Sequence, residues 1–238
     1  MPPKKNYNRY KNKKTYKGKP RVTASATKAL VKNTLLRMAE TNYKSYDIKG
    51  SIFRHDTLAR HDLWSPTSTD ANSIWPLQND SDSGRSGDMI QVAGIKIRGV
   101  FEVPNDRFNA KMKLYFVQWN SGDGTPTTQS EFFHNVSGNI MIDPIQNKRF
   151  RNVLKLGMIQ CRATDVQQGT AQTKTIFFSK WIPMNKKVYF KGDGSENPSN
   201  LKEYGSILFC PYDTISSATT DNIFINSELT YTVYYKDI

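Results

Sequence analysis

The alternation of hydrophobic and polar positions after residue 88 predicts a protein built from β-strands. The clearest run is 89–103, where isoleucine and valine recur mostly at every second position, the period of a strand with one buried face. Gly94 and Gly99 interrupt this run and predict bulges or bends within it. A similar pattern predicts six further strands, at 111–119, 150–160, 174–183, 187–191, 205–210 and 228–236.

Long polar segments connect these strands, at 64–88, 120–130, 192–204 and 211–222. Short strands with long connections and almost no helix predict an all-β fold, an antiparallel sandwich or barrel. Loops of such length usually contact other molecules, and Trp64 and Trp75 flank the first of them with aromatic side chains. We therefore expect 64–88 and 120–130 to lie at subunit contacts or on the outer surface.

Charge separates an N-terminal arm from a folded body. Twelve of the 34 Lys and Arg residues lie within positions 1–39, and the first acidic residue is Glu40. The remaining 22 basic residues and all 21 acidic residues follow, so the net charge of +13 belongs almost entirely to the arm. Apolar residues are scarce before position 23, which predicts an arm without packing support, and helical spacing predicts a short helix in 23–40. The predicted domains are an arm, 1–40, and a body, 41–238.

The arm has the composition of a nucleic-acid-binding segment. Each lysine or arginine can displace a counterion from a phosphate backbone, and each tyrosine can stack on an unpaired base. A solvated charge run or a nuclear import signal alone are the alternatives, but the absence of acids before Glu40 favours nucleic-acid contact. Import is compatible with binding. The predicted nucleic-acid-binding residues are Lys4, Lys5, Tyr7, Arg9, Tyr10, Lys11, Lys13, Lys14, Tyr16, Lys17, Lys19 and Arg21.

The sequence contains few features that would support an enzymatic activity or a metal site. The motifs of serine hydrolases, zinc metalloproteases and P-loop proteins are missing, so we expect no enzyme activity and no cofactor. His55 and His61 stand beside aspartates, but a spacing of six fits neither a helix face nor a zinc finger, and surface polar contacts are the favoured interpretation. Residues 80–84 resemble a calcium loop without its later ligands. We expect no metal site.

Membrane and secretory classes are also disfavoured. The chain has no apolar run that could span a bilayer, and its N-terminus has no apolar core of a secretory signal. Cys161 and Cys210 are too few for a disulfide framework and are expected to be free thiols in a reducing compartment. The four tryptophans are expected to be core or interface anchors.

Four segments resemble, in order, the capsid proteins of small circular Rep-encoding single-stranded DNA viruses, which are circovirus-like. Residues 38–44 (MAETNYK) are similar to the segment after their basic arm, and 85–99 (RSGDMIQVAGIKIRG) resembles their Arg-x-Gly motif and isoleucine strand. Residues 181–190 (WIPMNKKVYF) resemble a late strand pair. Residues 231–237 (YTVYYKD) resemble the closing strand, with Tyr235 where phenylalanine is more usual.

The resemblance implies a single jelly-roll β-sandwich, two four-stranded antiparallel sheets with strand orders BIDG and CHEF. It implies a structural protein that self-assembles into a small icosahedral T=1 shell and packages circular single-stranded DNA through its arm. The implied locations are the virion and, during infection, the host nucleus. The implied partners are other copies of the chain, single-stranded nucleic acid and the host nuclear import machinery, with no membrane; no attachment factor can be named.

Two alternatives stay open at this point. A jelly-roll capsid protein of a small RNA or satellite virus shares the fold and the arm, and phosphate and stacking contacts do not separate DNA from RNA. A non-viral nucleic-acid-binding β-barrel module is less favoured, because such a module carries cations on its folded surface, whereas the body of this chain is nearly neutral.

Overall fold

The computed structural model describes residues 27, 28, 31, 34, 41–64, 74–78, 84–107, 109–123, 126, 128–134, 137–146, 148–161, 173–191 and 198–238. The chain divides into two units, Met1–Met38 and Ala39–Ile238. The four described residues of the segment 23–40 are helical, and the rest of that segment lies outside the described residues. Every strand named below belongs to the second unit.

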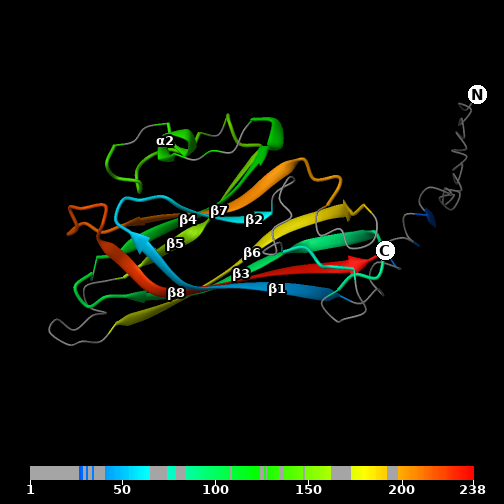
Figure 1. The fold of residues 1–238 in the computed structure, drawn as a ribbon, viewed down its shortest axis with the longest axis horizontal. Helices are drawn as coiled ribbons and strands as arrows, with labels where there is room; N and C mark the ends of the chain where they lie inside the picture. The colour runs from blue at the N-terminus through cyan, green and yellow to red at the C-terminus, as the bar shows by residue number, and fades with distance from the viewer. Residues whose placement is uncertain are drawn as a thin grey trace, which may run out of the picture. The chain divides into compact units, whose positions relative to one another are not determined.

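Eight strands and two short helical turns make up the second unit. They are β1 (Asn42–Arg54), β2 (Ala59–Trp64), β3 (Met89–Val103), β4 (Lys111–Asn120), η1 (Ser121–Asp123), α2 (Gln129–Phe132), β5 (Asn152–Gln160), β6 (Lys174–Tyr189), β7 (Glu203–Tyr212) and β8 (Asn222–Asp237). The strands form two four-stranded sheets that face one another (Figure 1), with the orders β1-β8-β3-β6 and β2-β7-β4-β5. All the pairings between these strands are antiparallel.

The strand order identifies the topology. When the strands are lettered B to I along the chain, the first sheet has the order B-I-D-G and the second C-H-E-F. Successive strands therefore alternate between the sheets except for β4 and β5, which are neighbours in the second sheet, and this is the order of a jelly roll built from two Greek keys. The predicted fold class, a single jelly-roll β-sandwich, is confirmed.

Several details of the strand prediction need correction. The prediction of 89–103 is confirmed as β3, but 174–183 and 187–191 are one strand, β6, which continues through Asn185 in a left-handed conformation with φ of 44°. The register of β3 shifts between Val92 and Gly94 against both neighbours, which confirms the bulge at Gly94. Gly99 pairs without a shift, and a Cβ there would lie 2.6 Å from the Phe101 ring. Its role is therefore close packing and not a bulge.

Strands β1 and β2 were not predicted from the pattern. The side of β1 that faces the core carries Lys44, Tyr46 and Ile48 in half-buried positions, so polar and apolar residues mix on both of its faces and the period of two is weak. β1 is also an edge strand, paired to β8 alone. Its place in the sheet is set by that pairing, which the local sequence does not reveal.

The main core lies between the two sheets and is rich in aromatic side chains. Phe53 lies 4.8 Å from Phe209 and 6.0 Å from Phe101, measured between ring centroids, so rings from both sheets interdigitate. Each large apolar side chain fully buried in this way contributes about 1.5–3 kcal/mol. The loop between β2 and β3 adds Trp75, which lies 5.6 Å from Trp64. These two tryptophans anchor the loop to the core, which confirms the core alternative expected for them. That 64–88 lies at a subunit contact or on the outer surface stays a prediction.

Candidate nucleic-acid interface

The twelve predicted nucleic-acid-binding residues, from Lys4 to Arg21, all lie outside the described residues. Their assignment therefore stays a prediction that rests on composition. In the described part of the molecule, a ligand could bind to the two outward faces of the sandwich or to the loops at its ends.

The Arg-x-Gly motif at 85–87 forms a structural anchor. Arg85 is fully buried, its guanidinium lies 4.0 Å from the centre of the Phe190 ring, and its Nη1 donates to the Gly87 carbonyl at 2.5 Å. A buried charge needs such partners to offset its lost hydration. Next to it, the Tyr235 hydroxyl donates to the Gly84 carbonyl at 2.7 Å. The motif therefore ties the loop before β3 to β6 and to the last strand.

The two histidines predicted to make surface contacts are turned inward instead. His61 Nδ1 lies 3.2 Å from the Tyr231 hydroxyl, so it joins β2 to β8 across the core, and burial lowers its pKa to about 4. His55 is buried, and its Nδ1 accepts the backbone N–H of Asp213 at 3.2 Å. The expectation of surface contacts was wrong because His61 meets Tyr231 across the core and His55 bonds to the backbone of Asp213 and Asp221.

In the part of the chain that the structure describes, there is no candidate metal site and no candidate membrane-spanning helix. No group of three or more His, Cys, Asp or Glu side chains there is arranged to hold a metal ion. The calcium-like segment 80–84 is described only at Gly84. Among the described residues, no helix is long and apolar enough to cross a membrane. Cys161 and Cys210 are buried free thiols, and burial raises the pKa of the Cys210 thiol.

The outward face of the sheet β2-β7-β4-β5 is covered by the segment 121–151, which we name the covering segment. Figure 1 shows it, with α2, on the side of this sheet that faces away from the other sheet. Phe132, Phe133 and Phe150 from the segment pack with Trp119 and Leu208 of the sheet into a second apolar cluster. The indole of Trp119 also stacks on the Tyr204 ring at 5.2 Å and 10°.

Hydrogen bonds fasten the covering segment to itself and to the turn after β1. The Gln146 amide donates to the carbonyls of Ser130 at 2.7 Å and Phe133 at 3.0 Å. The Asp56 carboxylate accepts the backbone N–H of Ile140 at 2.6 Å. Residues 120–130, expected as a contact loop, are thus the start of a longer segment that covers a sheet of its own subunit. The expectation that they also touch a neighbouring subunit stays a prediction.

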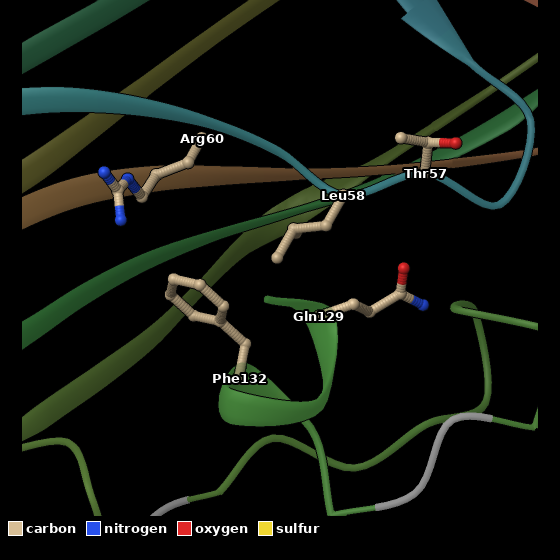
Figure 2. Close-up of a pocket in the computed structure, with 5 residues that line it drawn as sticks. All are labelled: Thr57, Leu58, Arg60, Gln129 and Phe132. Carbon is tan, nitrogen blue, oxygen red and sulfur yellow. The ribbon is translucent and has the colours of Figure 1, made fainter. Parts of the chain in front are cut away.

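A cavity of about 480 Å³ lies between the covering segment and the end of β2, lined by Thr57, Leu58, Arg60, Gln129 and Phe132. In Figure 2, Leu58 and Phe132 point toward one another across it. Its cation is already engaged, because Arg60 Nε lies 3.0 Å from Asp62 Oδ1 and its guanidinium stands 5.9 Å from the Trp119 ring centre. The cavity is therefore a gap beneath the covering segment, and its one charged side chain, Arg60, already has partners within the protein.

The outward face of the sheet β1-β8-β3-β6, which we name the open face, exposes aromatic side chains. Tyr43 of β1 is 56% exposed and Trp181 of β6 is 41% exposed. Tyr234 of β8 lies between them, with its ring centroid 6.2 Å from Tyr43 and 5.6 Å from Trp181. These three rings, which we name the aromatic row, run across the sheet from β1 over β8 to β6, and Trp181 is displaced along its strand because it pairs with Lys96 and not with Gly94.

A glycine lets the aromatic row cross the third strand. Gly94 of β3 pairs with Tyr234 of β8, and a Cβ at Gly94 would lie 2.4 Å from Cζ2 of Trp181. The indole therefore lies against the backbone of β3, which it could not approach over any other residue. This use of Gly94 is hidden in the sequence, where the residue shows only as an interruption of a strand.

Charge on the open face is arranged around the row. Lys96 pairs with Trp181 itself and with Thr232, which lies two residues before Tyr234 on β8. Lys236 lies two residues after Tyr234, so strand alternation puts it on the same face. The acids Asp47 and Glu228 lie farther along the sheet, where Asp47 pairs with Thr230. The region of the row is therefore aromatic and cationic.

Comparison with known proteins gives likenesses to viral structures only at a low level. No family model and no curated protein matches the chain. Similar solved chains come from Turnip Yellow Mosaic Virus (7% identity, TM-score 0.34, 84% of this chain and 94% of that chain) and Tomato Aspermy Virus (12%, 0.29, 90% and 95%). Another comes from the unassembled VP1 pentamer of KI Polyomavirus (8%, 0.23, 82% and 93%). These TM-scores are too low to carry an argument, so the fold assignment rests on the strand order of this chain.

Proposed function

We propose that this chain is a viral capsid protein that self-assembles into a small icosahedral shell and packages circular single-stranded DNA through its arm. The observation that carries the proposal is the jelly-roll strand order of the body, joined to an arm that holds twelve cations and no acid before Glu40. A nearly neutral sandwich with a cationic arm divides shell building from cargo binding within one chain. In this proposal the protein is structural and has no enzymatic role.

Charge arithmetic supports packaging by the arm. A shell of about sixty copies, the smallest closed icosahedral number, would carry roughly 700 arm cations. That charge would neutralise a substantial part of a single-stranded genome. DNA is preferred to RNA as the cargo because the segments at 38–44, 85–99, 181–190 and 231–237 resemble capsid proteins of circular single-stranded DNA viruses. Virion and host nucleus are the proposed locations, with nuclear import through the basic clusters of the arm.

Electron microscopy of the purified recombinant protein is the first test. We expect uniform closed particles in negative stain, with encapsidated nucleic acid that survives external nuclease. Cargo released from virions should then be degraded by DNase and not by RNase. A monomeric protein at all concentrations and salt conditions would contradict the capsid proposal, and cargo degraded by RNase alone would favour the RNA or satellite virus alternative.

Deletion of residues 1–22 tests the arm separately. The deletion removes nine cations together with Tyr7, Tyr10 and Tyr16, so we expect a folded body that loses most of its affinity for a single-stranded oligonucleotide. Binding by the full chain should fall steeply between about 50 and 300 mM salt, because each phosphate contact releases a counterion. Replacing the nine cations with Gln, while the tyrosines stay, is the matched control. Unchanged, salt-insensitive binding after deletion would overturn this mechanism.

A further inference from the structure

We propose that the aromatic row of Tyr43, Tyr234 and Trp181 is a base-stacking site for single-stranded nucleic acid on the folded body. The inference rests on the proposed function, since it assigns a second contact to the same cargo. In this proposal the arm binds phosphates through its charge, whereas the aromatic row stacks on unpaired bases. The site lies on the open face of the sheet β1-β8-β3-β6.

The geometry of the row suits unpaired bases. Its rings come from three different strands, neighbouring centroids are 6.2 and 5.6 Å apart, and neighbouring rings are tilted by 37° and 55°, so each ring offers its own stacking surface to a successive base of a flexible single strand. Four-stranded antiparallel sheets in RNA-binding modules use exposed aromatic residues in the same manner to stack two or three bases. Exposure of the outer two rings, Tyr43 and Trp181, leaves surface for a base to cover.

The charges beside the row suit a phosphate backbone. Lys96 and Lys236 lie on opposite sides of the line of rings, one pair of positions away along β8. A strand whose bases lie on the rings would place phosphates within reach of these flexible side chains. The acids Asp47 and Glu228 stand farther from the row, so repulsion of a polyanion is weakest at the row itself.

The order of the chain supports a common ligand for the arm and the row. The predicted arm ends at residue 40, β1 begins at Asn42, and Tyr43 is its second residue. The predicted contacts of the arm end at Arg21, so a nucleic acid bound there is tethered to the strand that bears the first ring by the 21 residues between Arg21 and Tyr43. Such tethering raises the local concentration of bases at the row, so weak stacking there adds to the total affinity.

A second copy of the chain is the competing occupant of the open face. Protein interfaces deplete lysine and favour continuous apolar surface at their centres, whereas this row is flanked by Lys96 and Lys236 and by the polar pair Ser45 and Thr232. Double-stranded DNA fits less well, because its bases are already stacked on one another. The row therefore favours single strands.

The test uses the full chain with Tyr43→Leu and Trp181→Leu combined. Leucine keeps apolar cover over Gly94 and removes the aromatic surface. Because base–aromatic stacking contributes substantially per base, we expect affinity for an oligodeoxythymidine probe to fall at least about fivefold. Affinity for inorganic polyphosphate, which has charge and no bases, should stay the same. Tyr189→Leu is the matched control, since Tyr189 is similarly exposed on β6 at 42% and lies outside the row.

Tryptophan fluorescence provides a direct readout. Trp181 is the exposed member of the four tryptophans, while Trp64, Trp75 and Trp119 are buried. Stacking of a base should quench the exposed indole, and the quenching by oligodeoxythymidine should disappear in Trp181→Leu. The same change in the arm-deleted chain should remove the residual, weakly salt-dependent binding.

The outcomes separate the two proposals. Loss of oligodeoxythymidine affinity with polyphosphate binding intact supports the row. Unchanged affinity for both probes, or an equal loss of both, overturns it while leaving arm-driven packaging intact. Loss of particle assembly with oligonucleotide binding unchanged would assign the open face to contacts between copies. Absence of polyphosphate binding by the wild-type chain would instead contradict the proposed function.

Discussion

The two sheets of the sandwich use aromatic residues on their outward faces in opposite ways. On the sheet β2-β7-β4-β5, Trp119 is fully buried beneath the covering segment, against Phe132 and Phe150. On the sheet β1-β8-β3-β6, Trp181 remains 41% exposed beside Tyr234. Both tryptophans belong to strands and point away from the main core.

The difference between the faces comes from one connection. The segment between β4 and β5 folds back over its own sheet and converts that face into a second apolar cluster. An aromatic side chain on a strand therefore has no fixed role, because its role depends on whether another segment lies over it. The covered face adds buried apolar area to the fold, whereas the open face leaves the rings of Tyr43 and Trp181 exposed.

Alanine at each of the two tryptophans gives the largest expected effect and the most direct test of this comparison. Trp119→Ala should lower the free energy of unfolding by about 3–5 kcal/mol, since it removes a buried ring and leaves a cavity. Trp181→Ala should cost about 1 kcal/mol or less, as expected for an exposed site. Urea denaturation of both variants measures the difference. Equal losses would mean that the two faces do not differ in packing.

The pH dependence of stability tests the region shared by both sheets, where His61 joins β2 to β8. Burial lowers the pKa of His61 to about 4 from an ordinary 6.5, so the unfolded chain binds the proton first as the pH falls. The stability linked to His61 is fully present above pH 6.5 and is lost between pH 6.5 and 4, by at most about 3 kcal/mol.

Unfolding experiments across that pH range isolate this effect. His61→Gln should have a shallower loss of stability than the wild-type chain between pH 6.5 and 4. His134→Gln, at an exposed position, is the control and should follow the wild-type curve. A His61→Gln curve parallel to the wild-type curve would show that this histidine does not stay neutral in the folded protein.

A smaller loss is expected where β7 passes under Trp64. A Cβ at Gly205 would lie 2.2 Å from Cζ2 of Trp64, whereas a Cβ at Gly122 in the covering segment meets nothing within 4 Å. Gly205→Ala should therefore cost about 1–3 kcal/mol through overpacking, and Gly122→Ala should be close to neutral. Thermal denaturation of the pair checks this expectation, and a neutral Gly205→Ala would show that Trp64 can move aside.

The smallest effect concerns how the covering segment is held. Gln146→Ala removes the side-chain amide that donates to Ser130 and Phe133, at a cost of about 1 kcal/mol. Hydrogen exchange should become faster at 129–133 and stay unchanged in β3 and β8. Asn152→Ala removes an exposed hydrogen bond from the Asn152 side-chain amide to Gln118 Oε1 at 3.2 Å. This control should leave hydrogen exchange at 129–133 unchanged. Faster exchange in every strand would show that the segment does not open separately.

The sequence by itself determined the all-β class, most of the strands and the separation of a cationic arm from a neutral body. Strand β3 could be predicted to the residue because isoleucine, valine and phenylalanine recur at every second position on both sides of the bulge at Gly94. The ordered resemblance of the four segments 38–44, 85–99, 181–190 and 231–237, together with the arm, led to the jelly roll, and the strand order of the structure confirms the fold. The assignment of nucleic-acid binding to the arm rests on composition alone and stays a prediction.

Tertiary structure alone decided which of these residues face solvent. The inward turn of His61 and the burial of Arg85 depend on partners that are distant in the chain, Tyr231 and Phe190. The aromatic row depends on the antiparallel register that places Tyr43 and Gly94 beside Tyr234, although the three positions are far apart in sequence. The local pattern predicts which residues share a face of a strand. Which neighbours that face contacts depends on the pairing between strands and on whether another segment lies over it.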